Sequence, residues 1–129
     1  MTPPGIPRPY RVLVVEQDRE RARELRTLLS RDDCECEVAL DLETAEQVTS
    51  DRRMEAVVVD LAVDGVSADD ALEAFGSSGD EYGLVFFNGS TDESIQRRYR
   101  REGADSYLSH KSDLKRVANA ARRNINNGQ

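Results

Sequence analysis

The chain has 129 residues, of which 38% are hydrophobic and 33% are charged, with 25 acidic against 18 basic side chains and a net charge of −7. This length and composition predict one globular domain. The negative charge argues against a general nucleic-acid binder, whose affinity depends on neutralising phosphates. No apolar run approaches the roughly 20 residues of a membrane-spanning helix, so we expect a cytoplasmic protein with no membrane partner.

The first nine residues, MTPPGIPRP, contain all four prolines of the chain and no apolar segment. Proline fixes φ and lacks a backbone N–H, and a signal peptide needs an apolar core of its own. We therefore expect a Pro-rich flexible tail over residues 1–9, a folded domain over residues 10–126 and a disordered end over residues 127–129.

The folded region opens with an apolar run, YRVLVVE, that predicts a buried strand over residues 10–16. A helix is expected next, over residues 18–32, because apolar side chains recur there at helical spacing behind a capping Asp18. Its apolar face consists of Ala22, Leu25, Leu28 and Leu29.

The two cysteines, Cys34 and Cys36, lie in the segment DDCECEVAL, which predicts a second strand. A Cys-x-Cys pair lacks the second ligand pair of a structural zinc site. Residues two apart in a strand share a face, so both cysteines are expected to point inward together with Val38. We interpret them as small buried hydrophobic residues.

The alternation continues to the end of the chain. Helices are expected over residues 41–53 and 67–75, on either side of the apolar strand AVVVD, and Ser67 with Asp70 predicts a capping box. After the strand YGLVFFN, Ser90 with Glu93 is expected to cap a helix that buries Ile95 and Tyr99. The short strand DSYLS and a last helix complete the pattern. The stripe of that helix consists of Leu114, Val117, Ala118, Ala121 and Ile125.

Five strands that alternate with five helices predict an α/β fold, a doubly wound parallel sheet with helices on both faces. In open sheets of this class, the ligand crevice lies at the carboxyl ends of the strands. Four of the expected strands end in polar residues, which would meet at one edge. They are Glu16 and Gln17, Asp60, Asn88 followed by Gly89 and Ser90, and Ser109 followed by His110. Such oxygen-rich ends suit a hard cation such as Mg²⁺.

From Arg11 to about Ile125, the sequence resembles the receiver domain of two-component response regulators. An acidic residue follows the first strand, an aspartate ends the third, and GADSYLSHK resembles the family pattern Gly-Ala-Asp-x-Tyr-Leu-x-Lys-Pro. The resemblance implies a flavodoxin-like (βα)5 fold with strand order 2-1-3-4-5. It also implies a signalling protein that is not an enzyme.

The resemblance implies that Asp60 is the phosphoacceptor, which takes a phosphoryl group from a sensor histidine kinase or a phosphotransfer protein in the presence of Mg²⁺. The implied metal ligands are Glu16, Asp60, the backbone carbonyl of Ala62 and, weakly, Gln17. The residues implied to contact the phosphoryl group or to switch with it are Asn88, Gly89, Tyr107 and His110. The output is implied to pass through the fourth helix, fifth strand and fifth helix.

Three site positions depart from the family pattern. Gln17 is a neutral amide where the family has a second acid, and Asn88 replaces the usual Ser or Thr. His110 and Lys111 stand where the family has Lys-Pro. We therefore expect Mg²⁺ binding to be weak or absent. His110 is either an exposed strand-end residue or a pH-sensitive cation that substitutes for the lysine, and a one-residue shift could bring in Lys111 instead.

An arginine cluster occupies the fourth expected helix, in an otherwise acidic chain. This helix face is either simply solvated or a docking face for an acidic downstream protein or a second copy of the chain. The expected partner face consists of Arg97, Arg98, Arg101, Tyr107 and Lys111. No nucleic-acid reading module is present, so direct nucleic-acid binding is not expected.

Three functions stay open from the sequence. The first is a receiver that is phosphorylated on Asp60, and the second is a pseudo-receiver, a protein-interaction module without regulated phosphorylation. The third is a small flavin- or nucleotide-binding α/β enzyme, which is disfavoured because the chain lacks a Gly-rich phosphate-binding loop.

Overall fold

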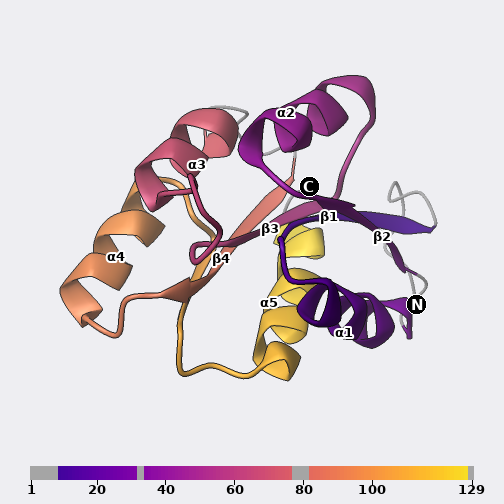
Figure 1. Cartoon of the computed structure of the whole chain (residues 1–129). Helices are drawn as coiled ribbons and strands as arrows, with labels where there is room; N and C mark the ends of the chain where they lie inside the picture. Colours follow the sequence, from indigo (N-terminus) through magenta and orange to yellow (C-terminus); the bar gives the residue numbers. More distant parts are fainter. Residues whose placement is uncertain (1–8, 32–33, 77–81, 128–129) are drawn as a thin grey trace.

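The computed structural model describes residues 9–31, 34–76 and 82–127. Most of the expected tail (1–9) and of the expected end (127–129) lies outside these residues. Ten elements alternate along the chain (Figure 1). The strands are β1 (Tyr10–Val15), β2 (Cys34–Ala39), β3 (Ala56–Asp60), β4 (Gly83–Gly89) and β5 (Ser106–Ser109). The helices are α1 (Arg19–Ser30), α2 (Leu42–Asp51), α3 (Ala68–Phe75), α4 (Glu93–Glu102) and α5 (Leu114–Asn127).

The five strands form one parallel sheet in the order β2-β1-β3-β4-β5. This parallel order, with a helix in each connection between strands, confirms the expected fold class. Because the strands are parallel, all their carboxyl ends lie at one edge of the sheet. The strand order changes direction between β1 and β3, which is the switch point of the sheet.

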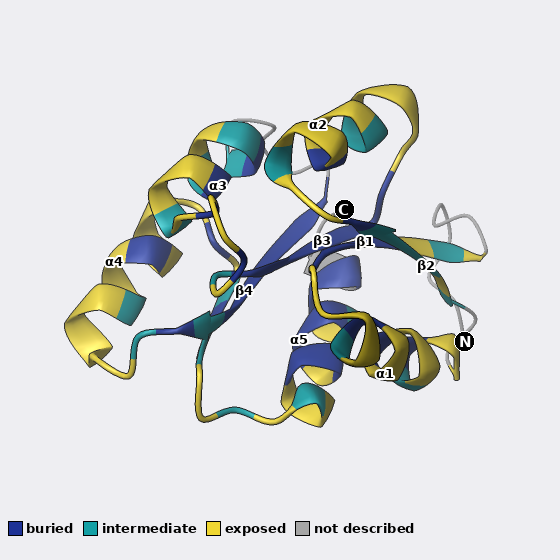
Figure 2. Ribbon diagram, viewed as in Figure 1, coloured by how far each residue is buried: buried dark blue, intermediate teal, exposed yellow. Residues whose placement is uncertain are grey.

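The core lies in two layers, one on each face of the sheet (Figure 2). In β1, Leu13 and Val15 pack toward α2, α3 and α4, while Val12 and Val14 pack toward α1 and α5. The same two-residue alternation continues in β3 and β4, as expected for strands covered on both sides. The central strands are therefore buried throughout, which explains their nearly continuous apolar runs.

The two cysteines occupy the position that the sequence predicts. Cys34 and Cys36 are partly buried, and both pack against the cluster beneath α1 and α5. Glu35, between them, is exposed. Burial raises the pKa of the Cys36 thiol, so this residue acts as a packing group rather than as a reactive thiolate.

The helix starts agree with expectation for α1 and α3 and differ for α4. Asp18 accepts from the first-turn N–H groups of α1, and Ser67 accepts from the N–H of Asp70. The expectation that Ser90 and Glu93 cap α4 is wrong, because Asp92 Oδ1 accepts from the Ser94 N–H and is the N-cap. Ser90 Oγ instead accepts from the Asp92 N–H within the preceding loop.

The inner face of α4 is narrower than the sequence predicts. Tyr99 is buried, but Ile95 is 37% exposed, so its expected burial is wrong. Tyr99 is the one buried residue of this helix, and the arginines of the helix are exposed to solvent. Within the described residues, no helix combines the length and apolar character that crossing a bilayer requires.

Candidate functional site

The carboxyl ends of β1 and β3 bring two buried acids together. These strands pair in register up to Val15 and Val59, so Glu16 and Asp60 are the next residues on adjacent strands. Their exposed fractions are 2% and 1%. Two adjacent buried carboxyl groups repel each other when both are charged and must be met by donors or by a cation. The contacts of Asp60 therefore determine what this site can bind.

Both carboxylate oxygens of Asp60 accept hydrogen bonds. The N–H of Ala62 and the side-chain Nδ2 of Asn88 donate to Oδ1 at 2.8 and 2.9 Å. The Nη1 of Arg21 donates to Oδ2 at 2.9 Å, which makes a charge-assisted hydrogen bond. The donors come from the loop after β3, the end of β4 and the first turn of α1, so three separate segments converge on this side chain.

Arg21 is the functional residue that the sequence interpretation missed. Its Nε lies 3.5 Å from Glu16 Oε1, and its Nη2 lies 3.6 Å from Asp18 Oδ2. Its side chain is 35% exposed although Glu16 and Asp60 are buried. One signal was available, because Arg21 lies one helical turn before the buried Leu25. The helix therefore turns this arginine toward the strand ends.

Only one of the two carboxyl oxygens of Glu16 accepts hydrogen bonds from the backbone. Its Oε2 accepts from the N–H groups of Gln17 and Asp18 at 3.0 and 3.4 Å, whereas its buried Oε1 has no hydrogen-bond partner. Burial first, and then the neighbouring Asp60 carboxylate, raise the pKa of Glu16 to about 8, while the Asp18 N–H and the Arg21 guanidinium act in the opposite direction. Glu16 therefore keeps its proton to a higher pH than a free glutamate does.

Two of the expected Mg²⁺ ligands, Gln17 and Asp60, have other partners in this arrangement. Gln17 is exposed, and its Nε2 donates to the backbone carbonyl of Leu40 at 3.3 Å. Ala62 contributes its N–H to Asp60. Within the described residues, no group of three or more His, Cys, Asp or Glu side chains is arranged to hold a metal ion. Glu16 and Asp60 are adjacent, as expected, but they share a guanidinium.

The ends of β4 and β5 form the other half of this edge. Asn88 has φ +59°, a left-handed conformation that asparagine tolerates better than most residues. Tyr107 is only 6% exposed, and its hydroxyl oxygen accepts from the Ser90 N–H at 2.9 Å. A Cβ on Gly89 would lie 2.5 Å from this ring. The buried position of Tyr107 therefore requires glycine at position 89.

The aromatic ring of Tyr107 also connects the edge to α4. It stacks on Tyr99 with the ring centroids 5.6 Å apart, and the Tyr99 hydroxyl donates to Asp69 Oδ1 at 3.0 Å. Tyr107 is thus buried beneath α4, next to the predicted partner face. It supports that face from behind.

His110 and Lys111 follow the end of β5 and lie at the surface. Both are exposed, and the N–H of His110 donates to the Gly89 carbonyl at 3.0 Å. In the described part of the chain, none of the hydrogen bonds or ion pairs of Asp60 involves either side chain. The cation that meets Asp60 comes from α1 instead of β5.

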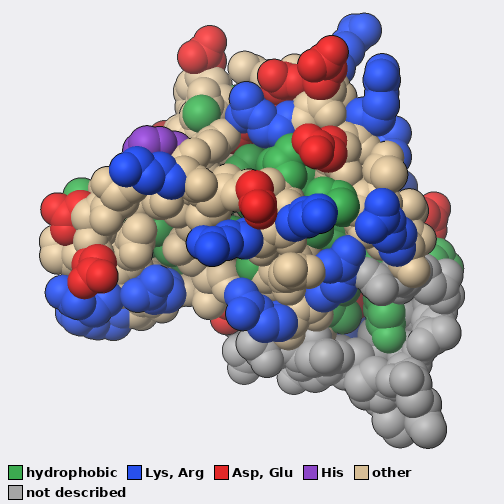
Figure 3. Space-filling view, turned by 90° about the horizontal axis from the view of Figure 1, so that it is seen from below, with side chains coloured by type: hydrophobic (Ala, Val, Ile, Leu, Met, Phe, Trp, Pro, Cys, Tyr) green, Lys and Arg blue, Asp and Glu red, His purple; other side chains and the backbone are tan. Residues whose placement is uncertain are grey.

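The α4 arginines lie at the surface. Arg97, Arg100 and Arg101 are exposed, and Arg98 is 3.1 Å from Glu102, 3.4 Å from Asp69 and above the Tyr99 ring. Residues 97–129 carry nine Lys or Arg and three Asp or Glu, in a chain that is acidic overall. Figure 3 shows that basic side chains also gather on the side of the sheet covered by α1 and α5.

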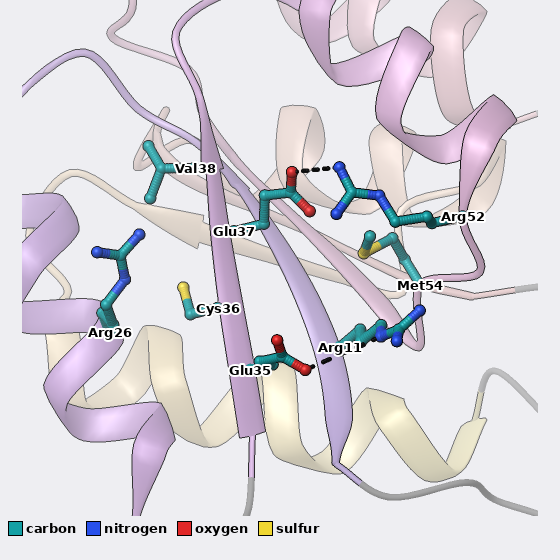
Figure 4. Close-up of a pocket in the computed structure, with 8 residues that line it drawn as sticks. All are labelled: Arg11, Arg26, Glu35, Cys36, Glu37, Val38, Arg52 and Met54. Atoms are coloured by element: carbon teal, nitrogen blue, oxygen red, sulfur yellow. Dashed lines mark hydrogen bonds and ion pairs between the residues drawn. The ribbon is translucent and has the colours of Figure 1, made fainter.

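A separate cavity of about 350 Å³ lies along the edge strand β2 (Figure 4). Arg52 and Glu37 form an ion pair of 2.7 Å across it, and Arg11 lies 4.0 Å from Glu35. The remaining lining residues are Arg26, Cys36, Val38 and Met54. None of the expected site residues lines this cavity, and its acids and arginines largely satisfy each other.

A family model matches most of the chain, and several solved structures share its fold. The family model described as "Response regulator receiver domain" matches residues 12–122. The receiver domain of a Francisella response regulator has a TM-score of 0.74 at 17% identity, covering 88% of this chain and 98% of its own. A response regulator receiver domain protein from Clostridium thermocellum has a TM-score of 0.76 at 18% identity, covering 91% and 94%.

One similar structure is much longer than this chain. NtrX from Brucella abortus, solved in complex with ATP, has a TM-score of 0.74 at 19% identity over 92% of this chain, which spans only 27% of NtrX. Likeness at such low identity shows the fold alone. Among curated proteins, no sequence matches the chain.

Proposed function

We propose that Asp60 occupies the phosphoacceptor position of this chain and that the output of the chain passes through the surface of α4, β5 and α5. The premise is that the chain belongs to the response regulator receiver domain family of two-component signalling. Receiver domains are signalling modules that interact with histidine kinases or phosphotransfer proteins and with downstream effectors. The observation that carries the proposal is the placement of Asp60, buried at the carboxyl end of β3 beside the switch point of the sheet.

The chemistry proposed for Asp60 is phosphoryl transfer from a phosphohistidine. A carboxylate oxygen forms a bond to phosphorus while the phosphorus–nitrogen bond breaks, and the electron pair leaves with the imidazole, which takes up a proton. The Ala62 N–H, the Asn88 amide and the Arg21 guanidinium already point at the carboxylate. They supply donors close to where charge on the transferred oxygens must be met.

Receiver domains typically bind Mg²⁺ at this site, but the residues here do not fit that ion as they are arranged. Gln17 turns to a backbone carbonyl, and Arg21 donates to Asp60 Oδ2. We therefore assign no step to a metal. The Ala62 N–H, the Asn88 amide and the Arg21 guanidinium are the groups that this chain itself provides.

The proposed output surface is basic. Arg97, Arg98 and Arg101 project from α4, and Lys111 lies in the loop between β5 and α5. A positive patch on a chain of net charge −7 favours an acidic partner through complementary charge. Tyr107, beneath α4, links this surface to the loop that follows β4.

A second candidate function is a pseudo-receiver that binds partners without regulated phosphorylation. The contact that favours it is the ion pair between Arg21 and Asp60, since an aspartate whose two oxygens already accept three donors is a poorer nucleophile. No observation on the described residues favours the flavin- or nucleotide-binding enzyme.

Phosphorylation by a small donor separates the two candidates. The protein is incubated with acetyl phosphate or phosphoramidate, with and without Mg²⁺, and its intact mass is measured. A phosphoryl adduct on the wild type that disappears in Asp60→Asn supports the phosphoacceptor. Asp64→Asn is the matched control, because Asp64 is exposed in the following loop, and it should keep the adduct. No adduct under any condition would favour the pseudo-receiver.

A further inference from the structure

Arg21 brings its guanidinium close to two buried acids, 3.5 Å from Glu16 and 2.9 Å from Asp60. Among the described residues, it is the only cation that forms an ion pair with Glu16 or Asp60. It also approaches Asp18, the N-cap of its own helix, at 3.6 Å. The planar fork of arginine can serve several carboxyl groups at once, which a lysine ammonium does less well.

The carboxyl groups that Arg21 meets are those that a metal at this edge would need. Mg²⁺ requires near-octahedral oxygen ligands at about 2.0–2.1 Å, and Asp60 Oδ2 already accepts from Arg21 Nη1. The other oxygen, Oδ1, accepts from Ala62 and Asn88. A dication placed beside the guanidinium would also be repelled, since like charges a few Å apart interact strongly where water is scarce.

The first turn of α1 fixes this arrangement. Asp18 Oδ1 accepts from the N–H groups of Glu20 and Arg21 at 2.9 and 3.0 Å, so the backbone of Arg21 is anchored where its side chain begins. Leu25, one turn later, is fully buried. The helix cannot rotate Arg21 away from the strand ends without exposing this leucine. The guanidinium can therefore move away from the strand ends only if the Arg21 side chain changes its rotamer.

We propose that Arg21 is the resident counter-cation of this site, which takes the place of a divalent metal beside Glu16 and Asp60 and excludes Mg²⁺. This inference concerns Asp60, and only its relevance to signalling rests on the proposed role of Asp60 as the phosphoacceptor. The guanidinium would set the charge of the site without any metal. Phosphorylation of Asp60, where it occurs, would then be independent of Mg²⁺.

Calorimetric titration of Mg²⁺ into the purified chain tests this proposal without a phosphoryl donor. The wild type is expected to show no saturable binding at millimolar Mg²⁺, whereas Arg21→Gln should gain at least about tenfold in affinity, because removal of one close positive charge lowers the repulsion of the dication. Arg23→Gln, an exposed arginine on the same helix, is the matched control and should behave as the wild type. Arg21→Gln/Asp60→Asn should lose the gained binding, which assigns it to this site.

A saturable Mg²⁺ site in the wild type, or no gain in folded Arg21→Gln, would overturn the proposal. Folding is checked by far-UV circular dichroism and cooperative urea unfolding. Should Arg21→Gln not fold, Arg21→Lys supplies the test, because a single ammonium leaves more of the carboxylate oxygens free. Its Mg²⁺ affinity should exceed that of the wild type, and an affinity equal to or below the wild type overturns the proposal.

The outcome of this experiment can be distinguished from the outcome of the phosphorylation test. Gained Mg²⁺ binding in Arg21→Gln with no phosphoryl adduct on any variant would retain the counter-cation and reject the phosphoacceptor. An Asp60 adduct without any gain in Mg²⁺ binding would do the reverse.

Discussion

The two halves of the carboxyl edge of the sheet are stabilised by different kinds of contact. At the ends of β1 and β3, two buried acids are met by the guanidinium of Arg21 and by neutral donors. At the ends of β4 and β5, the contacts are aromatic and backbone ones, centred on Tyr107 and the Ser90 N–H. The first half balances charge, and the second half fixes the shape of the loop that leads to α4.

This difference shows where the positive charge of the site originates. From the sequence, His110 was either an exposed strand-end residue or a cation that substitutes for the lysine; it is exposed, and among the described residues it makes no hydrogen bond or ion pair with Asp60. The charge comes from α1, the helix that follows β1, and β1 is three positions from β5 in the sheet order. Charge and shape are therefore controlled by separate residues, so substitutions in the two halves should have separable effects.

The largest effect is expected from Gly89→Val, in the shape-controlling half. A side chain at this position would collide with the Tyr107 ring, since even a Cβ would lie 2.5 Å from it. We expect the free energy of unfolding to fall by about 4 kcal/mol, as for severe overpacking, measured by urea denaturation. Gly65→Ala is the control, with φ +79° but nothing within 4 Å, and should cost only about 1 kcal/mol. Equal costs would show that Tyr107 is not held by this contact.

A somewhat smaller effect is expected from Arg21→Ala, in the charge-balancing half. Loss of the guanidinium leaves Asp60 buried without its ion-pair partner, and we expect a loss of about 3 kcal/mol in unfolding free energy. The second substitution of a double-mutant cycle, Asp60→Asn, removes the unpaired charge and should restore at least half of this loss. Additive losses would contradict a direct coupling between the two residues.

Glu16 predicts a pH dependence confined to the same half. Its pKa in the folded protein is raised to about 8 from an ordinary value of 4.5, so the folded state binds the proton more tightly than the unfolded state. This stabilisation is fully present below about pH 4.5 and is lost as the pH rises through about 8. Because the proton is coupled to Asp60 and Arg21 lies nearby, we expect a decrease of about 2 kcal/mol between pH 5 and pH 9.

Glu16→Gln provides the comparison for this pH profile. The amide cannot titrate, so the decrease between pH 5 and pH 9 should be largely absent from the variant when both proteins are unfolded in urea across that range. A slope identical to that of the wild type would assign the pH dependence to other groups.

The smallest effect on stability is expected at the surface of α4. Arg97→Glu/Arg101→Glu should change the free energy of unfolding by less than about 0.5 kcal/mol, because both side chains are exposed. Binding of a Glu/Asp-rich peptide, measured by fluorescence anisotropy, should weaken and lose its dependence on salt. Arg23→Glu/Arg31→Glu, on α1 and at its C-cap, makes the same change in charge and serves as the control. Equal weakening in both variants would argue against a specific α4 surface.

Most of the fold could be predicted from the sequence because its strands are buried on both faces. The runs around Val14 and Val58 are nearly continuous, the helices between them have one apolar side, and this pattern allows few arrangements other than a parallel sheet. The pairing of Glu16 with Asp60 follows from the same reasoning, since both end adjacent central strands.

The sequence interpretation failed where long side chains and local turns determine the outcome. Arg21 reads as one charge among several on a helix surface, and only its tertiary position shows that it reaches Asp60. At α4, both Ser90 and Asp92 can cap a helix, and the hydrogen bond from Ser94 decides between them. The burial of Tyr107 depends on the missing side chain of Gly89, a contact that no spacing rule reveals.

The most direct test of the Arg21 counter-cation is a set of ¹H–¹⁵N NMR spectra of the wild type at increasing Mg²⁺ concentration. The Ala62 N–H and the Asn88 side-chain amide both donate to Asp60, so their resonances report any ion that reaches this carboxylate. We predict that they do not shift in the wild type at millimolar Mg²⁺ and shift in a saturable way in Arg21→Gln. Saturable shifts of these resonances in the wild type would contradict the account.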